Sequence, residues 1–160
     1  MNRVGTGYDL HRLVENKPLV LGGVEIEHYL GLEGHSDADV LLHALGDALL
    51  GAACLGDLGF HFPPGEDRYR DISSLVLLEE IKNKLLREGW KPANVDGVII
   101  AQAPPLAPYI ETMREKIASA LDISRCQVSV KATTTEQLGV CGREEGIAAQ
   151  AVVLLEKPAP

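Results

Sequence analysis

The stretch SDADVLLHALGDALLGAACL, residues 36–55, predicts a long amphipathic helix. Ser36 is a favourable N-cap, and Asp39 three residues later is a variant of the capping box. Apolar residues recur at spacings of three and four and form one helical face: Leu41, Leu45, Ala48, Leu49 and Ala52. This face needs a packing partner, which the segments on either side supply.

Strands and helices alternate around this helix. Strands are predicted at residues 2–8, 18–26 (bent at Gly22-Gly23), 95–102, 127–132 and 146–156. Further helices are predicted at 73–88, ended by Gly89, and at 108–121, opened by Pro108. The pattern favours an α/β fold of the α+β two-layer sandwich type, with one mixed sheet and helices on one face. The other face would need cover, which favours an oligomer.

Length and composition fit one globular domain spanning residues 1–160. The chain is 46% apolar and 24% charged, and no apolar run is long enough to span a bilayer. The N-terminal residues lack the apolar core of a signal peptide, so we expect a cytoplasmic location and no membrane partner. Cys54, Cys126 and Cys141 show no CxxC spacing, which favours free buried thiols.

The net charge of −8 argues against a nucleic-acid partner, because such surfaces are basic. It does not exclude a phosphorylated small molecule. Cations or backbone N–H groups would then have to supply much of the positive field. Metal ions are the simplest source.

A first candidate metal site lies in GYDLH, residues 7–11. In an extended strand Asp9 and His11 point to the same face, and both are metal-type ligands. The alternative is an exposed strand end that carries polar residues.

The helix at 36–55 offers a third ligand, His43, between Asp39 and Asp47 at spacings of four. A metal-bound histidine commonly donates its other ring N–H to a carboxylate, so Asp39 or Asp47 could orient His43. The alternative is an ordinary polar stripe on a solvent-facing side.

Two loops next to the predicted helix carry further polar residues. His35 and Ser36 precede the helix, where N–H groups favour an anion, although capping alone would explain Ser36. The loop GDLGFHFPPGED, residues 56–67, contains Gly56, Asp57 and Gly59. Its glycines permit close backbone approach to a ligand, and the loop is long enough to form a flap. The alternative is a polar connection between two helices.

Two strand ends complete the set of candidates. The small residues of AQAPPLAPY, 101–109, could read a planar base through backbone groups. KATTTEQLG, 131–139, ends a strand with three threonines and Glu136, which suit phosphate and a divalent metal but are also compatible with a plain strand end. Arg143 is either an anion contact or a surface charge.

Taken together, these segments resemble the 2-C-methyl-D-erythritol 2,4-cyclodiphosphate synthase family over essentially the whole chain. The resemblance rests on GTGYDLH, LGGVEI, GHSDADVLLHALGDALLGAACLGDLGFHFPP, VIIAQAPPLAPYI and KATTTEQLGVCGREEGIAAQAV. It implies a homotrimer of α/β subunits with active sites between neighbours. It also implies a phosphorus–oxygen lyase of the non-mevalonate isoprenoid pathway. Its nucleotide substrate would be 4-diphosphocytidyl-2-C-methyl-D-erythritol 2-phosphate, cyclised with release of CMP.

The resemblance assigns roles residue by residue. Zinc, one per subunit, would be bound by Asp9, His11 and His43, and Mg²⁺ or Mn²⁺ by Glu136 with the substrate phosphates. His35 and Thr134 would stabilise the transition state. The predicted substrate contacts are Asp9, His11, His35, Ser36, Asp57, Leu58, Gly59, Phe62, Glu66, Ala101, Gln102, Ala103, Pro104, Pro105, Leu106, Ala107, Thr133, Thr134, Thr135, Glu136, Val140 and Arg143.

The chain departs from many members of that family at Pro105, where they carry a basic residue, and at Val140, where an aromatic lines the trimer channel. Two other functions use the same residues. One is a zinc-dependent phosphoester hydrolase, and the other is a non-catalytic trimer that binds a nucleotide or an isoprenoid.

Overall fold

Residues 1–157 are described by the computed structural model, so the last three residues of the predicted 1–160 domain lie outside it. Within this range the main sheet has the strand order β4-β1-β7-β5-β6. Its strands are β1 (Asn2–Glu15), β4 (Leu30–Leu32), β5 (Lys91–Ile100), β6 (Val128–Thr133) and β7 (Gly146–Glu156). Strands β5 and β6 are parallel and the other pairs antiparallel, which confirms a mixed sheet.

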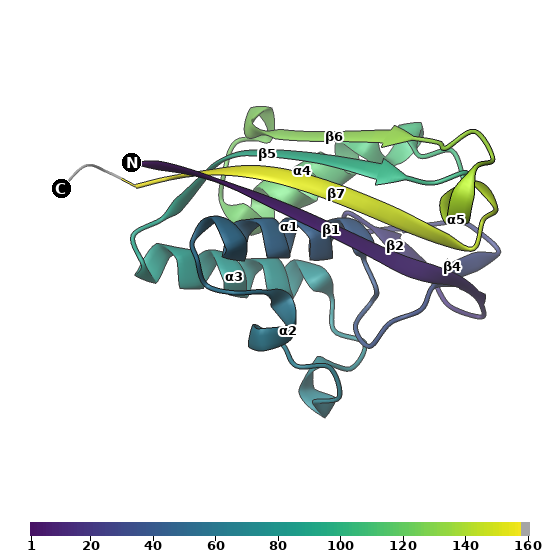
Figure 1. Cartoon of the computed structure of the whole chain (residues 1–160), viewed down its shortest axis with the longest axis horizontal. Helices are drawn as coiled ribbons and strands as arrows, with labels where there is room; N and C mark the ends of the chain where they lie inside the picture. The colour runs from purple at the N-terminus through teal and green to yellow at the C-terminus, as the bar shows by residue number, and fades with distance from the viewer. Residues whose placement is uncertain (158–160) are drawn as a thin grey trace.

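Alternating burial gives the sheet one covered face and one open face. On β1, Gly5, Gly7 and Leu13 are buried, whereas Tyr8 and Leu10 between them are exposed. The covered face packs on α1 (Val40–Ala52), α3 (Ser74–Arg87) and α4 (Ile110–Leu121), which run along the sheet (Figure 1). The two-layer α/β arrangement predicted from the pattern is confirmed.

The segment bent at Gly22-Gly23 is a hairpin of β2 (Leu19–Leu21) and β3 (Val24–Ile26). Both glycines have positive φ, +57° and +74°, which glycine adopts without the strain that a side chain would bring. This turn is important for the helix start described next.

Helix α1 begins later than predicted. Its N-cap is Asp39, whose side chain accepts the N–H of Leu42 at 3.1 Å, so the predicted cap at Ser36 is wrong. The Asp39 carboxylate also accepts the N–H groups of Gly22 and Gly23 at 3.0 and 2.7 Å. A hairpin distant in sequence therefore selects the helix start, which local cap chemistry could not reveal.

The remaining helices agree closely with the predictions. Ser73 caps α3, and Gly89 follows its end with a φ of +78°. Pro108 lies in the 3₁₀ turn η2 (Ala107–Tyr109), and α4 itself starts at Ile110. No local pattern predicted the short elements α2 (Leu58–His61), η1 (Asp67–Tyr69), η3 (Arg125–Gln127), α5 (Gly139–Gly142) and β4.

Strand β1 is longer than predicted, reaching Glu15, and β5 starts four residues earlier than predicted, at Lys91. The three cysteines are free, as predicted, but only Cys141 is buried. In residues 1–157 we find no helix with the length and apolarity needed to cross a membrane.

Candidate metal centre and substrate site

The metal-type ligands of β1 face the start of α1 because α1 lies directly on this strand. A Cβ at Gly7 would come within 2.0 Å of the Ala44 carbonyl oxygen, and one at Gly5 within 2.0 Å of the Ala48 oxygen. The absence of side chains there brings the helix backbone onto the strand. Asp9 and His11 follow on the same face of the strand.

The approach of α1 brings His43 to Asp9 and His11. The Asp9 Oδ2 atom lies 2.9 Å from His11 Nε2 and 3.0 Å from His43 Nδ1, and the two nitrogens are 3.1 Å apart. A tetrahedral ion with ligands at about 2.0–2.1 Å needs ligand atoms about 3.3 Å apart. The triangle is therefore close to the size that a tetrahedral metal requires, and the three side chains form a group able to hold one.

The outer ring nitrogens of both histidines have partners. His11 Nδ1 lies 2.6 Å from the Glu33 carbonyl oxygen, to which it donates, leaving Nε2 free to bind an ion. His43 Nε2 lies 3.1 Å from both Ser36 Oγ and Ser74 Oγ.

The predicted orientation of His43 by Asp39 or Asp47 is wrong. Asp39 is used by the hairpin turn and the helix cap, and Asp47 accepts the Leu58 N–H at 2.8 Å. Burial raises the pKa of Asp47. Two of the three polar residues on α1, Asp39 and Asp47, therefore join the helix to neighbouring segments. Only His43 reaches the candidate metal site.

Charge and hydrogen bonding within the triad favour its ionised form. Burial alone would raise the pKa of Asp9, but hydrogen bonds and charge from His11 and His43 hold it well below its usual range. Burial opposes protonation of His11, yet the hydrogen bond and charge of Asp9 raise the pKa of that imidazole. A carboxylate between two imidazoles is thus ready to receive a cation in place of protons.

A hollow of about 210 Å³ opens beside the triad. Five of the residues predicted as substrate contacts line it: His35, Ser36, Leu58, Gly59 and Phe62. Tyr69 and Leu77 line it too. Neither was predicted: Leu77 is one of several apolar residues of its helix, and Tyr69 lies in the short turn η1, which no local pattern marked.

The 56–67 loop closes one side of this hollow. Asp57 caps α2 by accepting the Phe60 N–H at 2.9 Å, and Asp57 is exposed. His35 Nε2 bonds the Glu66 carbonyl oxygen at 3.0 Å, whereas the Glu66 carboxylate pairs with Arg68. His35 is thus tied to the loop.

The threonine-rich strand end lies apart from the triad within one chain. Asp9 pairs with Ala149, which pairs with Ile99, which pairs with Ala132. Three strand spacings amount to about 14 Å. Thr134 and Glu136, just beyond β6, therefore belong to a second cluster.

This second cluster is well connected internally. The Ala101 N–H donates to the Thr133 carbonyl at 3.0 Å, and the Gln137 N–H donates to Gln102 Oε1 at 3.0 Å. Thr134 Oγ1 lies 3.2 Å from a Glu136 carboxylate oxygen. The structure thus brings the predicted base loop beside the predicted phosphate and metal segment, which is largely exposed.

Val140 and Arg143 lie at and after α5, at one edge of the open sheet face. Val140 lines a hollow with Leu10 and Gly146. Arg143 pairs with Glu145 at 2.8 Å, so its guanidinium is already engaged by an anion from its own chain.

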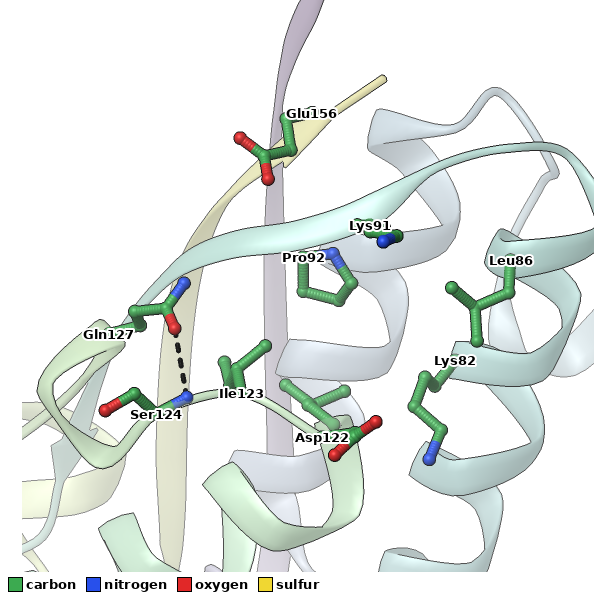
Figure 2. Close-up of a pocket in the computed structure, with 10 residues that line it drawn as sticks. Lys82, Leu86, Lys91, Pro92, Asp122, Ile123, Ser124, Gln127 and Glu156 are labelled. Atoms are coloured by element: carbon green, nitrogen blue, oxygen red, sulfur yellow. Dashed lines mark hydrogen bonds between the residues drawn. The ribbon is translucent and has the colours of Figure 1, made fainter. Parts of the chain in front are cut away.

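Another hollow, of about 520 Å³, contains none of the predicted site residues (Figure 2). It lies near Glu156, which pairs with Asn2 at the far end of β1, about 23 Å along the strand from Asp9. Its charged residues are of both signs, Lys82 and Lys91 with Asp122 and Glu156. The mixed signs do not indicate a ligand class.

A two-layer α/β fold with a two-histidine, one-carboxylate cluster beside a hollow defines a small α/β protein with a candidate metal site. The chain belongs to the YgbB family, whose model matches residues 2–156. A relative from Syntrophomonas wolfei named 2-C-methyl-D-erythritol 2,4-cyclodiphosphate synthase is 62% identical over 97% of this chain and 99% of its own length.

Solved structures agree. The bifunctional IspDF from Campylobacter jejuni superposes with a TM-score of 0.95 at 41% identity, over 99% of this chain and 43% of that longer one. IspF from Plasmodium falciparum in complex with CDP gives 0.86 at 33% identity, over 99% and 97%. The family resemblance predicted from the sequence is confirmed. The predicted activity, that of a cyclodiphosphate synthase of isoprenoid biosynthesis and so of a phosphorus–oxygen lyase, is confirmed with it.

Proposed function

We propose that residues 1–160 form one catalytic domain that cyclises 4-diphosphocytidyl-2-C-methyl-D-erythritol 2-phosphate to 2-C-methyl-D-erythritol 2,4-cyclodiphosphate. An oxygen of the 2-phosphate forms a new bond to the β-phosphorus, and the bond from that phosphorus to the bridging oxygen breaks. CMP leaves with that oxygen and its electron pair. The triad of Asp9, His11 and His43 beside an open hollow carries this proposal.

The ion at this triad is zinc in our proposal, one per subunit. Two imidazole nitrogens and one carboxylate oxygen match a catalytic zinc site, whereas Mg²⁺ prefers oxygen ligands and octahedral geometry. Such an ion, when bound, neutralises and polarises a phosphate oxygen through its open coordination position. With a second cation, it would also explain how a chain of net charge −8 accepts an anionic substrate.

The active form is a homotrimer with each site shared between neighbours. The open sheet face exposes Val4, Tyr8 and Val152 by 67%, 62% and 43%, which is unfavourable unless another surface covers it. The triad and the Thr134–Glu136 cluster also lie about 14 Å apart across three strands of one chain. A neighbouring copy could place its own cluster opposite this triad.

The chain's residues then hold the substrate as follows. Glu136 would hold Mg²⁺ or Mn²⁺ beside the substrate phosphates, and Thr134 with His35 stabilises the charge that develops at phosphorus. Ser36, Asp57 and Gly59 contact the methylerythritol phosphate. The 101–107 loop and Thr133 receive the cytidine through backbone groups. The CDP complex of the Plasmodium falciparum relative supports a cytidine nucleotide as the kind of ligand.

Phosphorus NMR on the purified protein with this substrate, zinc and Mg²⁺ tests the proposal. We expect the two coupled resonances of a cyclic diphosphate and one equivalent of CMP. A linear phosphate product would instead support a zinc-dependent phosphoester hydrolase, and unchanged substrate that binds would support a non-catalytic trimer. The cytoplasmic location stays a prediction from the sequence.

A further inference from the structure

The side of the His43 ring that points away from the triad meets two serine hydroxyls. His43 Nε2 lies 3.1 Å from Ser74 Oγ and 3.1 Å from Ser36 Oγ. Ser74 is the first residue of α3 and is 2% exposed, whereas Ser36 is half-buried and lines the hollow beside the triad. One ring N–H cannot be fully shared between them, so the partners of each hydroxyl decide its role.

The hydroxyl proton of Ser74 is already committed. Ser74 Oγ lies 2.5 Å from Asp37 Oδ1, and the Ser74 backbone N–H donates to Asp37 Oδ2 at 2.9 Å. An aspartate carboxylate only accepts hydrogen bonds, so the single hydroxyl proton of Ser74 points at Asp37. Toward His43 the Ser74 oxygen can then present only lone pairs.

We propose that Asp37 and Ser74 are positioning residues that fix the ring of His43 as an Nε2–H donor. An imidazole that donates from Nε2 keeps the Nδ1 lone pair for an ion, and Nδ1 is the atom that faces Asp9 and His11. The inference deepens the proposed metal site and rests on it. It supplies the carboxylate partner that Asp39 and Asp47 do not provide.

The relay of Asp37, Ser74 and His43 is itself held in place by backbone hydrogen bonds. The Asp37 N–H donates to the Ile72 carbonyl at 3.1 Å, and the Asp71 N–H donates to the His35 carbonyl at 2.9 Å. Two backbone bonds therefore join the segment before α1 to the segment before α3. Asp37 and Ser74 thus meet His43 on a fixed frame.

Ser36 takes the other role. Its Oγ accepts the Ala38 N–H at 3.3 Å, and its own proton is not required by a carboxylate in the described chain. Facing the hollow, this hydroxyl remains available to a substrate oxygen. The two serines divide the work, Ser74 orienting the metal ligand and Ser36 facing the substrate.

The test measures zinc affinity by competition with a chromophoric chelator, on metal-free wild-type protein and single variants. We expect Ser74→Ala to bind zinc about tenfold to a hundredfold more weakly, the usual effect of losing an outer partner of a metal-bound histidine. Asp37→Asn should also lower zinc affinity. The asparagine amide can turn its N–H donor toward Ser74 Oγ, and the Ser74 hydroxyl proton is then free to point at His43. The neighbouring Ser73→Ala, which removes only the α3 cap, should match wild type.

A second readout is spectroscopic. In the zinc-loaded protein with ¹⁵N-labelled histidine, the His43 Nε2 proton should give a slowly exchanging ring resonance, absent or fast-exchanging in Ser74→Ala. Unfolding of each metal-free variant is measured alongside, so that a folding loss is recognised.

Zinc affinity unchanged in Ser74→Ala, or lost instead in Ser36→Ala, would overturn the relay. Should the Ser74→Ala protein fail to fold, the Asp37→Asn variant and the wild-type His43 resonance decide: a ring proton on Nδ1 overturns the inference. A wild-type protein that binds no zinc would overturn the metal site itself, while cyclisation blocked with zinc binding intact would overturn only the proposed reaction.

Discussion

Replacing Gly7 by alanine should separate His43 from its two partner ligands. The new Cβ would lie 2.0 Å from the Ala44 carbonyl oxygen, whereas ordinary contact begins at 3.4 Å. Because the obstacle is helix backbone, α1 must move away from β1 by roughly 1.4 Å, and overpacking of this kind costs about 1–3 kcal/mol of stability. The movement is about half the length of each edge of the ligand triangle, which measures 2.9–3.1 Å.

The consequence for the metal site should exceed the consequence for the fold. Misplacing a group at a reaction site by 1 Å can cost about a hundredfold in rate, and we expect a loss of similar size for a displaced metal ligand. We therefore expect Gly7→Ala to remain folded but to lose zinc affinity and turnover by at least that factor. Chelator competition, elemental analysis after dialysis and thermal unfolding of the metal-free protein measure the two effects separately.

Helix α1 offers a matched control in Gly51. A Cβ there would meet nothing within 4 Å, so Gly51→Ala adds the same methyl group to the helix without displacing it. It should raise stability by up to about 1 kcal/mol, because alanine is the better helix former, and leave zinc binding unchanged. If Gly7→Ala binds zinc within twofold of wild type, the close approach of strand and helix does not position His43, and the reasoning fails.

Three further predictions follow from the site and its surroundings. Glu136→Gln should keep zinc and assembly, lose about a hundredfold or more in kcat and need more Mg²⁺ for half-maximal rate; identical Mg²⁺ titrations would exclude Glu136 as the second ligand. If the proposed homotrimer forms, mixtures of His43→Ala with a Thr134→Ala, Glu136→Gln variant should recover activity, since some interfaces combine two intact halves; mixed assemblies that stay inactive would refute shared sites. Burial raises the pKa of Asp39 from 3.8 to about 6. The native state therefore binds the Asp39 proton more tightly than the unfolded state does. The free energy of unfolding should fall by up to about 3 kcal/mol as the pH rises from the unfolded pKa of Asp39 to its native pKa. Denaturant unfolding at several pH values should show this slope in wild type and a flatter one in Asp39→Asn.

Local periodicity predicted most of the architecture. The strand and helix patterns located the main elements, because side-chain alternation and helical spacing are properties of a few consecutive residues. Asp9 and His11 were recognised for the same reason, since a spacing of two places them on one strand face. Their union with His43 required the resemblance to a known family, because no spacing within a chain reveals which helix lies on which strand.

The predictions for the α1 cap and for the partner of His43 were wrong because segments distant in sequence supply the hydrogen-bond partners there. Ser36 and Asp39 are equally acceptable caps by local chemistry, but only Asp39 also satisfies the N–H groups of Gly22 and Gly23. The same limit applies to the outer partner of His43. Spacing within one helix indicated Asp39 and Asp47, whereas the nearby hydroxyl backed by a carboxylate comes from α3.

The triad is therefore positioned by residues that take no part in its chemistry. Asp39 anchors the start of α1 to the β2–β3 turn, and Gly5 and Gly7 set the distance between helix and strand. Because the start of α1 and its distance from the sheet are both fixed, the position of a residue one turn into the helix is fixed as well. His43 is that residue. Gly5, Gly7, Asp9 and His11 are every second residue of β1, so all four lie on the same face of the strand. The two glycines allow α1 to lie close to the strand, and Asp9 and His11 then meet His43 of that helix. A site assembled in this way is preorganised in the folded chain, which is why small backbone changes should affect metal binding before they affect folding.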